Sequence, residues 1–150
     1  MDNFDLPIAL DGADPSHRRA MIASLAETMA SLPAEHQRSV EPINHFGGGV
    51  YARELFVGEG TVVVGMIHKR ENMLMLIKGD ATIYTETSSF RIQAPKIMVS
   101  PPGVQRVAYG HTDCIFVSVL AVGEERDVAK IEQEFVTTDL NDLALIEGGE

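Results

Sequence analysis

The feature that most constrains this chain is a run of short apolar segments between residues 43 and 122, separated by glycine and proline turns. Segments of strand length occur at residues 50–57, 61–68, 72–78, 81–86, 90–93, 96–100, 105–109 and 114–122. Turn residues separate them, including Gly79-Asp80, Pro101-Pro102-Gly103 and Gly110. No insertion of helix length lies between them, which excludes a parallel α/β sheet. We therefore expect an all-β fold, either an antiparallel barrel or a two-sheet jelly roll, over residues 44–123.

An arm and a helix precede this region, in residues 1–43. Asp14 is a suitable N-cap and Pro15 suits the first helical turn, so a helix is expected over about 15–32, ended by Pro33. One face of that helix would carry Met21, Ile22, Leu25, Met29 and Leu32. Two interpretations remain open: the helix covers one side of its own domain, or it belongs to an arm that docks on another subunit. The apolar residues Phe4, Leu6 and Ile8 motivate the second.

The last segment, residues 124–150, is predicted to open with a helix over 124–135, with Val128, Ile131 and Phe135 on its apolar face. Its acidic start, Glu124 and Glu125, suits the positive end of a helix dipole. The remainder mixes acidic residues with leucine. It is expected to be either a short final helix or an acidic tail that becomes ordered on a partner.

The charge of the chain excludes one class of function. The formal net charge is −10, which argues against a nucleic-acid binder that works by phosphate neutralisation. The single cysteine, Cys114, excludes an internal disulfide and a cysteine-based zinc site, and its apolar neighbours predict an inert core thiol. No signal peptide and no apolar run of membrane-spanning length is evident. These features predict a soluble, cytoplasmic protein that binds neither nucleic acid nor membrane.

Two stretches resemble the paired motifs of the cupin superfamily. The first runs from Gly60 to His68 and on to Gly79, where cupins place a glycine, a His-x-His pair, a carboxylate and a closing glycine. The second, Pro102-Gly103 to Arg106, resembles the Pro-x-Gly-x-x-His motif with Pro101 in its first place. The resemblance covers about residues 44–122 and implies a cupin-like jelly-roll barrel. With its flanking helices, the layout resembles small single-domain cupins encoded by tailed bacteriophages.

The departures from the motif bear directly on function. Cupin enzymes bind a divalent metal through up to three histidines and a carboxylate. In this chain His68 keeps the first position, but Arg70 and Arg106 stand where two further histidines are expected. The carboxylate position falls near residues 74–75, which are apolar. The motif therefore supplies one metal ligand, whereas a metal site needs about three.

Strand geometry suggests which side chains face the barrel mouth. Residues two apart share a face, so His68, Arg70 and Asn72 are expected to point into the mouth together, and Glu71 away from it. With Arg106 they form the predicted ligand-binding set. For a divalent metal, the runner-up cofactor, the candidate ligands are His68, Glu71, His111 and His45. Met66, Met73, Met75 and Met98 are expected to fill the core, and residues 47–49, Gly-Gly-Gly, to give a flexible lead into the barrel.

The arginines indicate a different chemistry. Two guanidinium groups repel cations and receive carboxylate or phosphate, and Arg53 is a candidate third positive group. The alternative is that each arginine pairs with a nearby acid, namely Glu54, Glu71 or Asp113.

Three functions compete on this basis. The first is a degenerate cupin with a non-enzymatic structural or accessory role, such as phage assembly, in the host cytoplasm or the virion. The others are a metal-dependent cupin enzyme and a small-anion binding module that uses Arg70 and Arg106. A homo-oligomer is expected, as are assembly partners bound through the N-terminal arm or the acidic tail.

Overall fold

The computed structural model describes residues 13–36, 41–139 and 142. Its elements in chain order are α2 (Pro15–Ala30), η1 (Ala34–His36), β1 (Ile43–Gly47), β2 (Val50–Val57), β3 (Val62–Val64), β4 (Ile67–His68), β5 (Asn72–Lys78), β6 (Asp80–Tyr84), β7 (Ser89–Gln93), β8 (Lys96–Ser100), β9 (Val107–Gly110), β10 (Cys114–Ala121), α3 (Val128–Phe135) and β11 (Val136–Thr137). Among these residues, no helix has the length and hydropathy that a membrane span requires. The apolar arm predicted at Phe4, Leu6 and Ile8 lies outside the described residues, as does nearly all of the acidic tail beyond Asp139.

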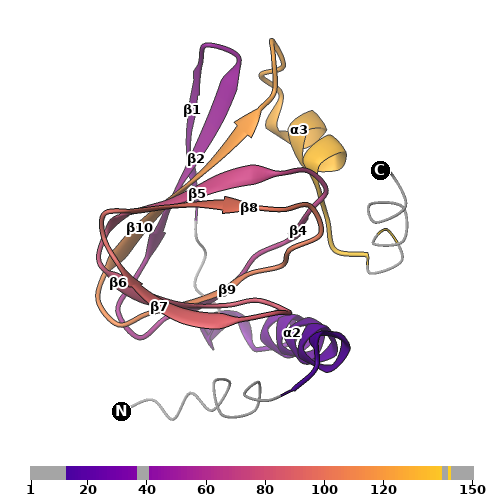
Figure 1. The fold of residues 1–150 in the computed structure, drawn as a ribbon, viewed down its shortest axis with the longest axis vertical. Coiled ribbons are helices and arrows are strands. Elements are labelled where there is room, and N and C mark those ends of the chain that lie inside the picture. The colour runs from indigo at the N-terminus through magenta and orange to yellow at the C-terminus, as the bar shows by residue number, and fades with distance from the viewer. Residues whose placement is uncertain (1–12, 37–40, 140–141, 143–150) are drawn as a thin grey trace.

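The strands form two facing sheets and one short pair (Figure 1). The larger sheet has the order β1-β2-β10-β5-β8, the smaller has the order β3-β9-β6-β7, and β11 pairs with β4. Every pairing is antiparallel. The prediction of an all-β, antiparallel jelly-roll barrel with flanking helices is confirmed, and within residues 60–120 there is no helix.

The structure corrects the expected strands in two places. The Gly-Gly-Gly run is not a flexible lead, because it makes the turn of a hairpin between β2 and an additional strand, β1. Gly48 and Gly49 have φ values of 60° and 78°, which glycine adopts without the steric cost of a Cβ atom. The segment 61–68 is not one strand, since it breaks at Gly65-Met66 into β3 and β4.

The main core fills the space between the two sheets. Its buried side chains come from alternate positions of strands in both sheets: Val57, Leu74, Leu76, Ala81, Ile83, Ile92, Cys114 and Phe116. The thiol of Cys114 is fully buried, as predicted, and burial raises its pKa above the ordinary value. Since thiolate is the reactive form, this environment keeps the group unreactive.

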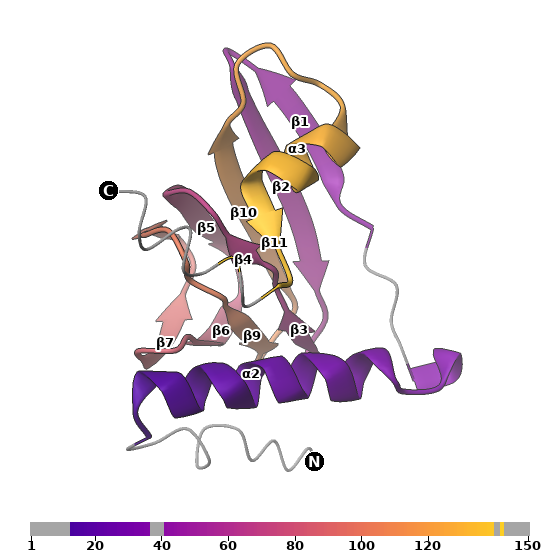
Figure 2. The same ribbon diagram turned by 90° about the vertical axis from the view of Figure 1, so that its right-hand side faces the viewer.

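Helix α2 lies across the side of the smaller sheet that is directed away from the main core (Figure 2). The Asp14 side chain accepts a hydrogen bond from the backbone N–H of His17 and Pro15 opens the helix, both as predicted. Ile22 is buried against Tyr84 and Val107 of that sheet. Of the two interpretations of this helix, the structure therefore supports the one in which it covers its own domain.

Arg18 fastens this helix to the turn between β6 and β7. Its side chain is only 5% exposed. Its Nε donates to the carbonyl oxygen of Thr85 at 2.9 Å, and its Nη2 donates to the carbonyl oxygen of Ser88 at 2.6 Å and to the Oγ of Ser89 at 2.8 Å. The buried guanidinium thus supplies a donor to the carbonyl of Thr85, and it adds a hydrogen bond to the carbonyl of Ser88, which also accepts from the N–H of Thr85.

We expect Arg18→Met to lower the free energy of unfolding by about 2 kcal/mol, because the Thr85 carbonyl is left buried without a donor. Urea denaturation followed by circular dichroism measures the loss. Arg70→Met, at an arginine whose side chain is 55% exposed, is the matched control, with an expected loss below about 1 kcal/mol. Equal losses in the two variants would contradict the role assigned to Arg18.

Helix α3 begins later than the sequence predicts. Its N-cap is Asp127, which accepts hydrogen bonds from the backbone N–H groups of Ala129 and Lys130, so Glu124 and Glu125 precede the helix instead of opening it. The predicted apolar face is confirmed for Ile131 and Phe135, which pack against Tyr51 and Leu120. Directly after α3, β11 pairs with β4, which brings the end of this helix to the strand that carries His68.

Candidate functional site

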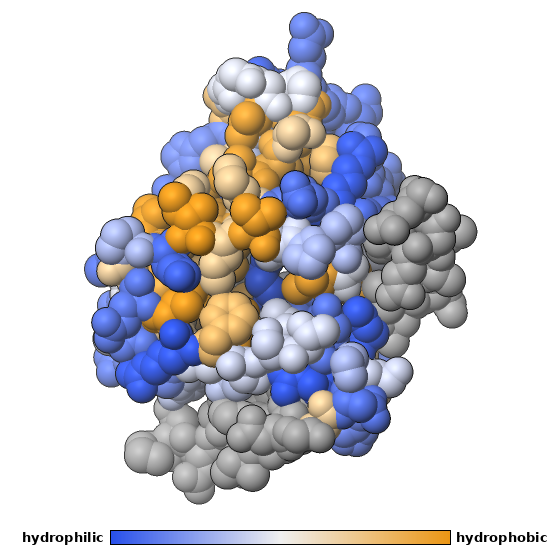
Figure 3. All heavy atoms as spheres, in the orientation of Figure 1, coloured by the Kyte–Doolittle hydropathy of each residue, from blue (hydrophilic) through white to orange (hydrophobic). Residues whose placement is uncertain are grey.

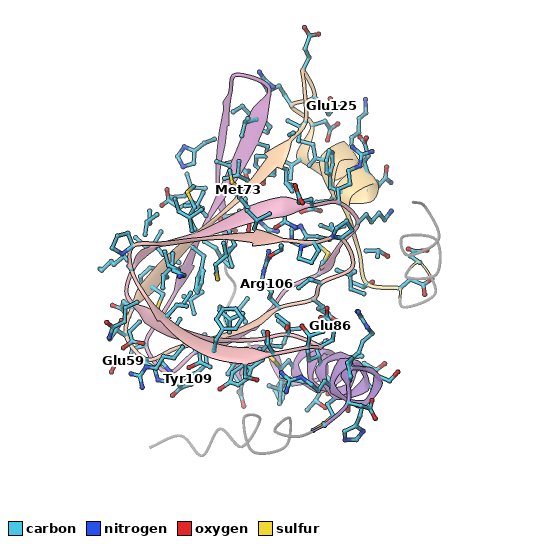
Figure 4. The ribbon with its side chains drawn as sticks, viewed as in Figure 1. Glu59, Met73, Glu86, Arg106, Tyr109 and Glu125 are labelled. Carbon is cyan, nitrogen blue, oxygen red and sulfur yellow. The ribbon has the colours of Figure 1, made fainter. Side chains whose placement is uncertain are left out.

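A cavity of about 340 Å³ lies between the two sheets. Most of its wall is apolar, from Leu55, Val57, Val63, Val64, Met66, Leu74, Ile83, Ala108, Phe116 and Val136. Four polar side chains complete the lining: Arg53, His68, Arg106 and Ser118. Figure 4 places Arg106 inside the barrel between the sheets, and Figure 3 shows a hollow near the same place. None of the described residues that line this cavity is acidic.

Backbone pairing explains why these polar groups converge. Arg53 on β2 is directly paired with Ser118 on β10, and both alternate with residues of the opposite face. The Pro-Pro-Gly turn pairs with His68, since the N–H of Gly103 donates to the carbonyl of His68 at 2.8 Å. The carbonyl of Arg106 then accepts from the N–H of Gly65 at 2.9 Å, so the break between β3 and β4 fixes its position.

Arg106 is a buried cation whose hydrogen-bond partners among the described residues are all neutral. Its Nη1 donates to the Oγ of Ser100, and its Nη2 donates to the Oδ1 of Asn72 at 3.2 Å and lies 3.4 Å from the Nε2 of His68. Burial lowers the pKa of Arg106 to about 10, an effect that the negative charge of Glu86 opposes. The guanidinium therefore stays charged at neutral pH without a directly bonded carboxylate.

His68 is a neutral imidazole with one unused nitrogen. Burial lowers its pKa to about 4, and the positive charges of Arg106 and Arg53 act in the same direction. A guanidinium has only donors, so the Nε2 that faces Arg106 must act as the acceptor, which leaves the proton on Nδ1. This Nδ1 is buried and has no hydrogen-bond partner among the described residues. A buried donor of this kind costs about 1–3 kcal/mol until an acceptor reaches it.

Arg53 has no hydrogen bond or ion pair within the part of the chain that the structure describes. The acids proposed as arginine partners do not reach it: Glu54 pairs with His45 at 3.1 Å, and Asp113 accepts from the N–H of Glu59. Arg53 does share a smaller cavity of about 40 Å³ with Glu132 of α3. The larger cavity therefore carries two guanidinium groups without a neutralising partner in contact.

The expected position of Arg70 is wrong. Its Nη2 donates to the Oε1 of Glu134 at 2.9 Å, and its guanidinium lies 4.6 Å from the centre of the Phe135 ring, outside the cavity. The cause is local, because β4 ends at His68 and the chain bends before β5 begins, so the two-residue alternation does not continue. Asn72 is nevertheless buried, and it contacts Arg106 as described above.

The four candidate metal ligands do not come together. His45 pairs with Glu54 on the side of β1 and β2 that faces away from the cavity. His111 lies 2.7 Å from the Oγ1 of Thr82, and Glu71 is exposed. The described residues contain no group of three His, Cys, Asp or Glu side chains that could hold an ion. The cavity does not fit the divalent metal that cupin enzymes use, because its one histidine lies beside two cations.

Sequence reasoning missed two polar residues at this site. Ser118 lines the cavity, and the Oγ of Ser100 accepts a hydrogen bond from Arg106. Both serines stand in otherwise apolar segments, where a single serine does not indicate a site. A signal was present for Ser118, because it alternates with the core residues Phe116 and Leu120 and therefore had to face inward.

Comparison with known proteins supports the fold. No protein-family model matches the chain, and no curated protein does. Among solved structures, a conserved protein with a double-stranded β-helix domain from Klebsiella pneumoniae matches with a TM-score of 0.50 and 19% identity, over 62% of this chain and 84% of that one. The fold is a double-stranded β-helix.

Two further neighbours carry the cupin description. A cupin superfamily protein from Desulfitobacterium hafniense matches with a TM-score of 0.48 and 13% identity, over 67% of this chain and 86% of that one. An RmlC-like cupin from Methanocaldococcus jannaschii matches with a TM-score of 0.48 and 14% identity, over 61% and 88%. Both of these neighbours are described as cupins.

Proposed function

We propose that the chain is a binding module that holds a small organic anion, a carboxylate on an apolar body, in the cavity between its sheets. The observation that carries the proposal is that Arg53 and Arg106 line one largely apolar cavity and that neither forms an ion pair with an acid among the described residues. The anion-binding function considered in the sequence analysis is therefore retained, but the second arginine of the site is Arg53 instead of Arg70.

The lining sets the class of ligand. Guanidinium groups bind carboxylates through charge-assisted, forked hydrogen bonds, and His68 and Ser118 add two further polar side chains to the same wall. The apolar wall favours a hydrocarbon body, because burying it is worth about 25 cal/mol per Å². A volume of about 340 Å³ suits a ligand of about ten non-hydrogen atoms.

A panel of ligands tests the proposal by thermal shift. We expect hexanoate and benzoate, at about 100 times Kd, to stabilise the wild type by about 3 kcal/mol, or a Tm increase of about 5–10 °C. Acetate lacks the apolar body and hexanol lacks the charge, so each should give a much smaller increase.

Variants assign the effect to the cavity. In Arg53→Ala/Arg106→Ala the hexanoate shift should disappear, whereas Arg70→Ala, the exposed arginine, should keep it. Arg53→Met leaves the buried bonds of Arg106 intact and serves if the double variant does not fold. The proposal fails if no anion raises the Tm of the wild type, or if Arg53→Met responds as the wild type does.

A second candidate is the non-enzymatic structural or accessory role, which we propose on the strength of an apolar outer sheet face described below. In the setting suggested by the resemblance to phage-encoded cupins, this role would be assembly in a host cytoplasm or a virion. It predicts that no member of the panel changes the Tm. No catalytic step is proposed, because the cavity offers neither a metal-ligand set nor an activated nucleophile.

A further inference from the structure

The larger sheet has a second apolar face, directed away from the cavity. Its side chains alternate with those that line the cavity, such as Leu55, Leu74 and Phe116. We call this set the outer face: Phe56, Met73, Met75, Ile77, Ile97, Val99, Ile115, Val117 and Val119. An antiparallel sheet that meets solvent on one side normally alternates apolar with polar residues. Over β10, β5 and β8 this one is largely apolar on both sides.

The outer face is continuous across β10, β5 and β8, and Phe56 of β2 adjoins it through its pairing with Ile115. Val117 is paired with Met75, and Met75 with Ile97; in the next row Val119 is paired with Met73, and Met73 with Val99. Exposed fractions are large: Phe56 54%, Met73 41%, Ile77 51%, Ile97 64% and Val99 62%. Met73 and Met75 were expected to fill the core, but both lie on the outer face. Figure 3 shows apolar side chains gathered in this region, where Figure 4 labels Met73.

We propose that the outer face is a self-association surface, covered in solution by the same face of a second copy of this chain. The five most exposed side chains present on the order of 500 Å² of largely apolar area, which reaches the largest patches usual on monomers. With the half-buried members of the outer face and its rim, the area approaches the roughly 800 Å² per partner of a stable interface.

Charge favours a second copy as the occupant. The members of the outer face are uncharged, and the two charged residues on the same side of the sheet, Glu54 and Lys78, have opposite signs, so an isologous pairing can match them. Glu54 on β2 is paired with Val117, and the exposed Lys78 on β5 is paired with Ile115, so the two charges stand on opposite sides of β10. A two-fold axis parallel to the strands brings opposite edges of the two copies together, and therefore opposite charges. Two aligned sheets pack about 10 Å apart in this manner.

The test is the mass in solution, measured by light scattering during size-exclusion chromatography of the full chain at about 50 µM. We expect the wild type to elute with about twice the chain mass of 16.3 kDa. Met73→Glu/Val99→Glu places two carboxylates in the centre of the outer face, and dimer affinity should fall at least 100-fold, giving a monomer. Leu32→Glu, an exposed apolar residue beyond the end of α2, is the matched control and should remain a dimer.

Two results would overturn the proposal. A wild type that is monomeric at this concentration would mean that the face is free or meets a different partner. A Met73→Glu/Val99→Glu protein that remains dimeric would place the interface elsewhere. Circular dichroism shows whether the double variant is folded, and Ile97→Lys, on the edge strand β8, replaces it if the fold is lost. Neither result depends on whether the cavity binds an anion.

Discussion

Gly79→Ala is expected to lower the free energy of unfolding by about 4 kcal/mol, the largest stability loss that we predict for a single methyl group in this chain. Gly79 joins β5 to β6 with a φ of +100°, a conformation that costs an L-residue about 1–2 kcal/mol. A Cβ atom there would lie 2.4 Å from the carbonyl oxygen of Asp113 and 2.7 Å from the Sγ of Cys114. The backbone itself must therefore move, which adds about 1–3 kcal/mol.

Gly48→Ala separates the cost of the positive φ from the cost of the close contacts. Gly48 also has a positive φ, +60°, but nothing lies within 4 Å of a Cβ atom built on it. This variant should lose about 1 kcal/mol. Urea denaturation of both variants and the wild type gives the comparison. Similar losses for Gly48→Ala and Gly79→Ala would mean that the close contacts at Gly79 relax without cost.

Stability is expected to rise by up to about 3 kcal/mol between pH 4 and pH 6.5 because of His68 alone. The pKa of His68 is lowered from 6.5 to about 4, chiefly by burial and then by the charges of Arg106 and Arg53. Between these two values the unfolded chain binds a proton that the folded chain does not. The free energy of unfolding therefore falls as the pH is lowered from 6.5 towards 4, and the contribution is fully present above 6.5.

A variant isolates this contribution from the carboxylates that titrate nearby. His68→Gln keeps an acceptor for Arg106 but does not titrate, so its stability should depend less steeply on pH over the same range. Urea midpoints at half-unit intervals of pH measure the difference between the two slopes. Parallel curves for the wild type and His68→Gln would show that His68 has an ordinary pKa in the folded protein.

Most strands could be predicted because alternation and turn chemistry agree in this sequence. Glycine at position 79 closes its hairpin as the motif implies, and the predicted strands correspond to those observed except that the segment 61–68 is divided into β3 and β4. β1 could not be found, because Ile43 and His45 on one of its faces are both exposed and the segment shows no apolar alternation. The outer face could not be predicted from the sequence either. In residues 73–77 both faces of the strand are apolar, and a sequence cannot show which of them a core covers.

The candidate site was predictable only where the strands are regular. Arg53 stands within a long strand, and Arg106 follows a turn with recognisable spacing, so both reach the cavity. The position of Arg70 was predicted wrongly because the alternation of side chains along a strand does not continue across the bend that separates β4 from β5. The spacing of His45, Glu71 and His111 along the chain carries no information about distance in space, and the fold keeps them apart.

The most direct test of the anion-binding cavity is a nuclear magnetic resonance titration that follows the arginine side-chain Nε–H signals while hexanoate is added. The eight arginines provide the internal comparison. Binding in the cavity predicts saturable shifts for the signals of Arg53 and Arg106 with one common Kd, and little change for Arg70 and Arg91, which are held by Glu134 and Asp80 on the exterior. Unchanged signals for Arg53 and Arg106 at saturating hexanoate, or equal unsaturable shifts for all arginines, would contradict it.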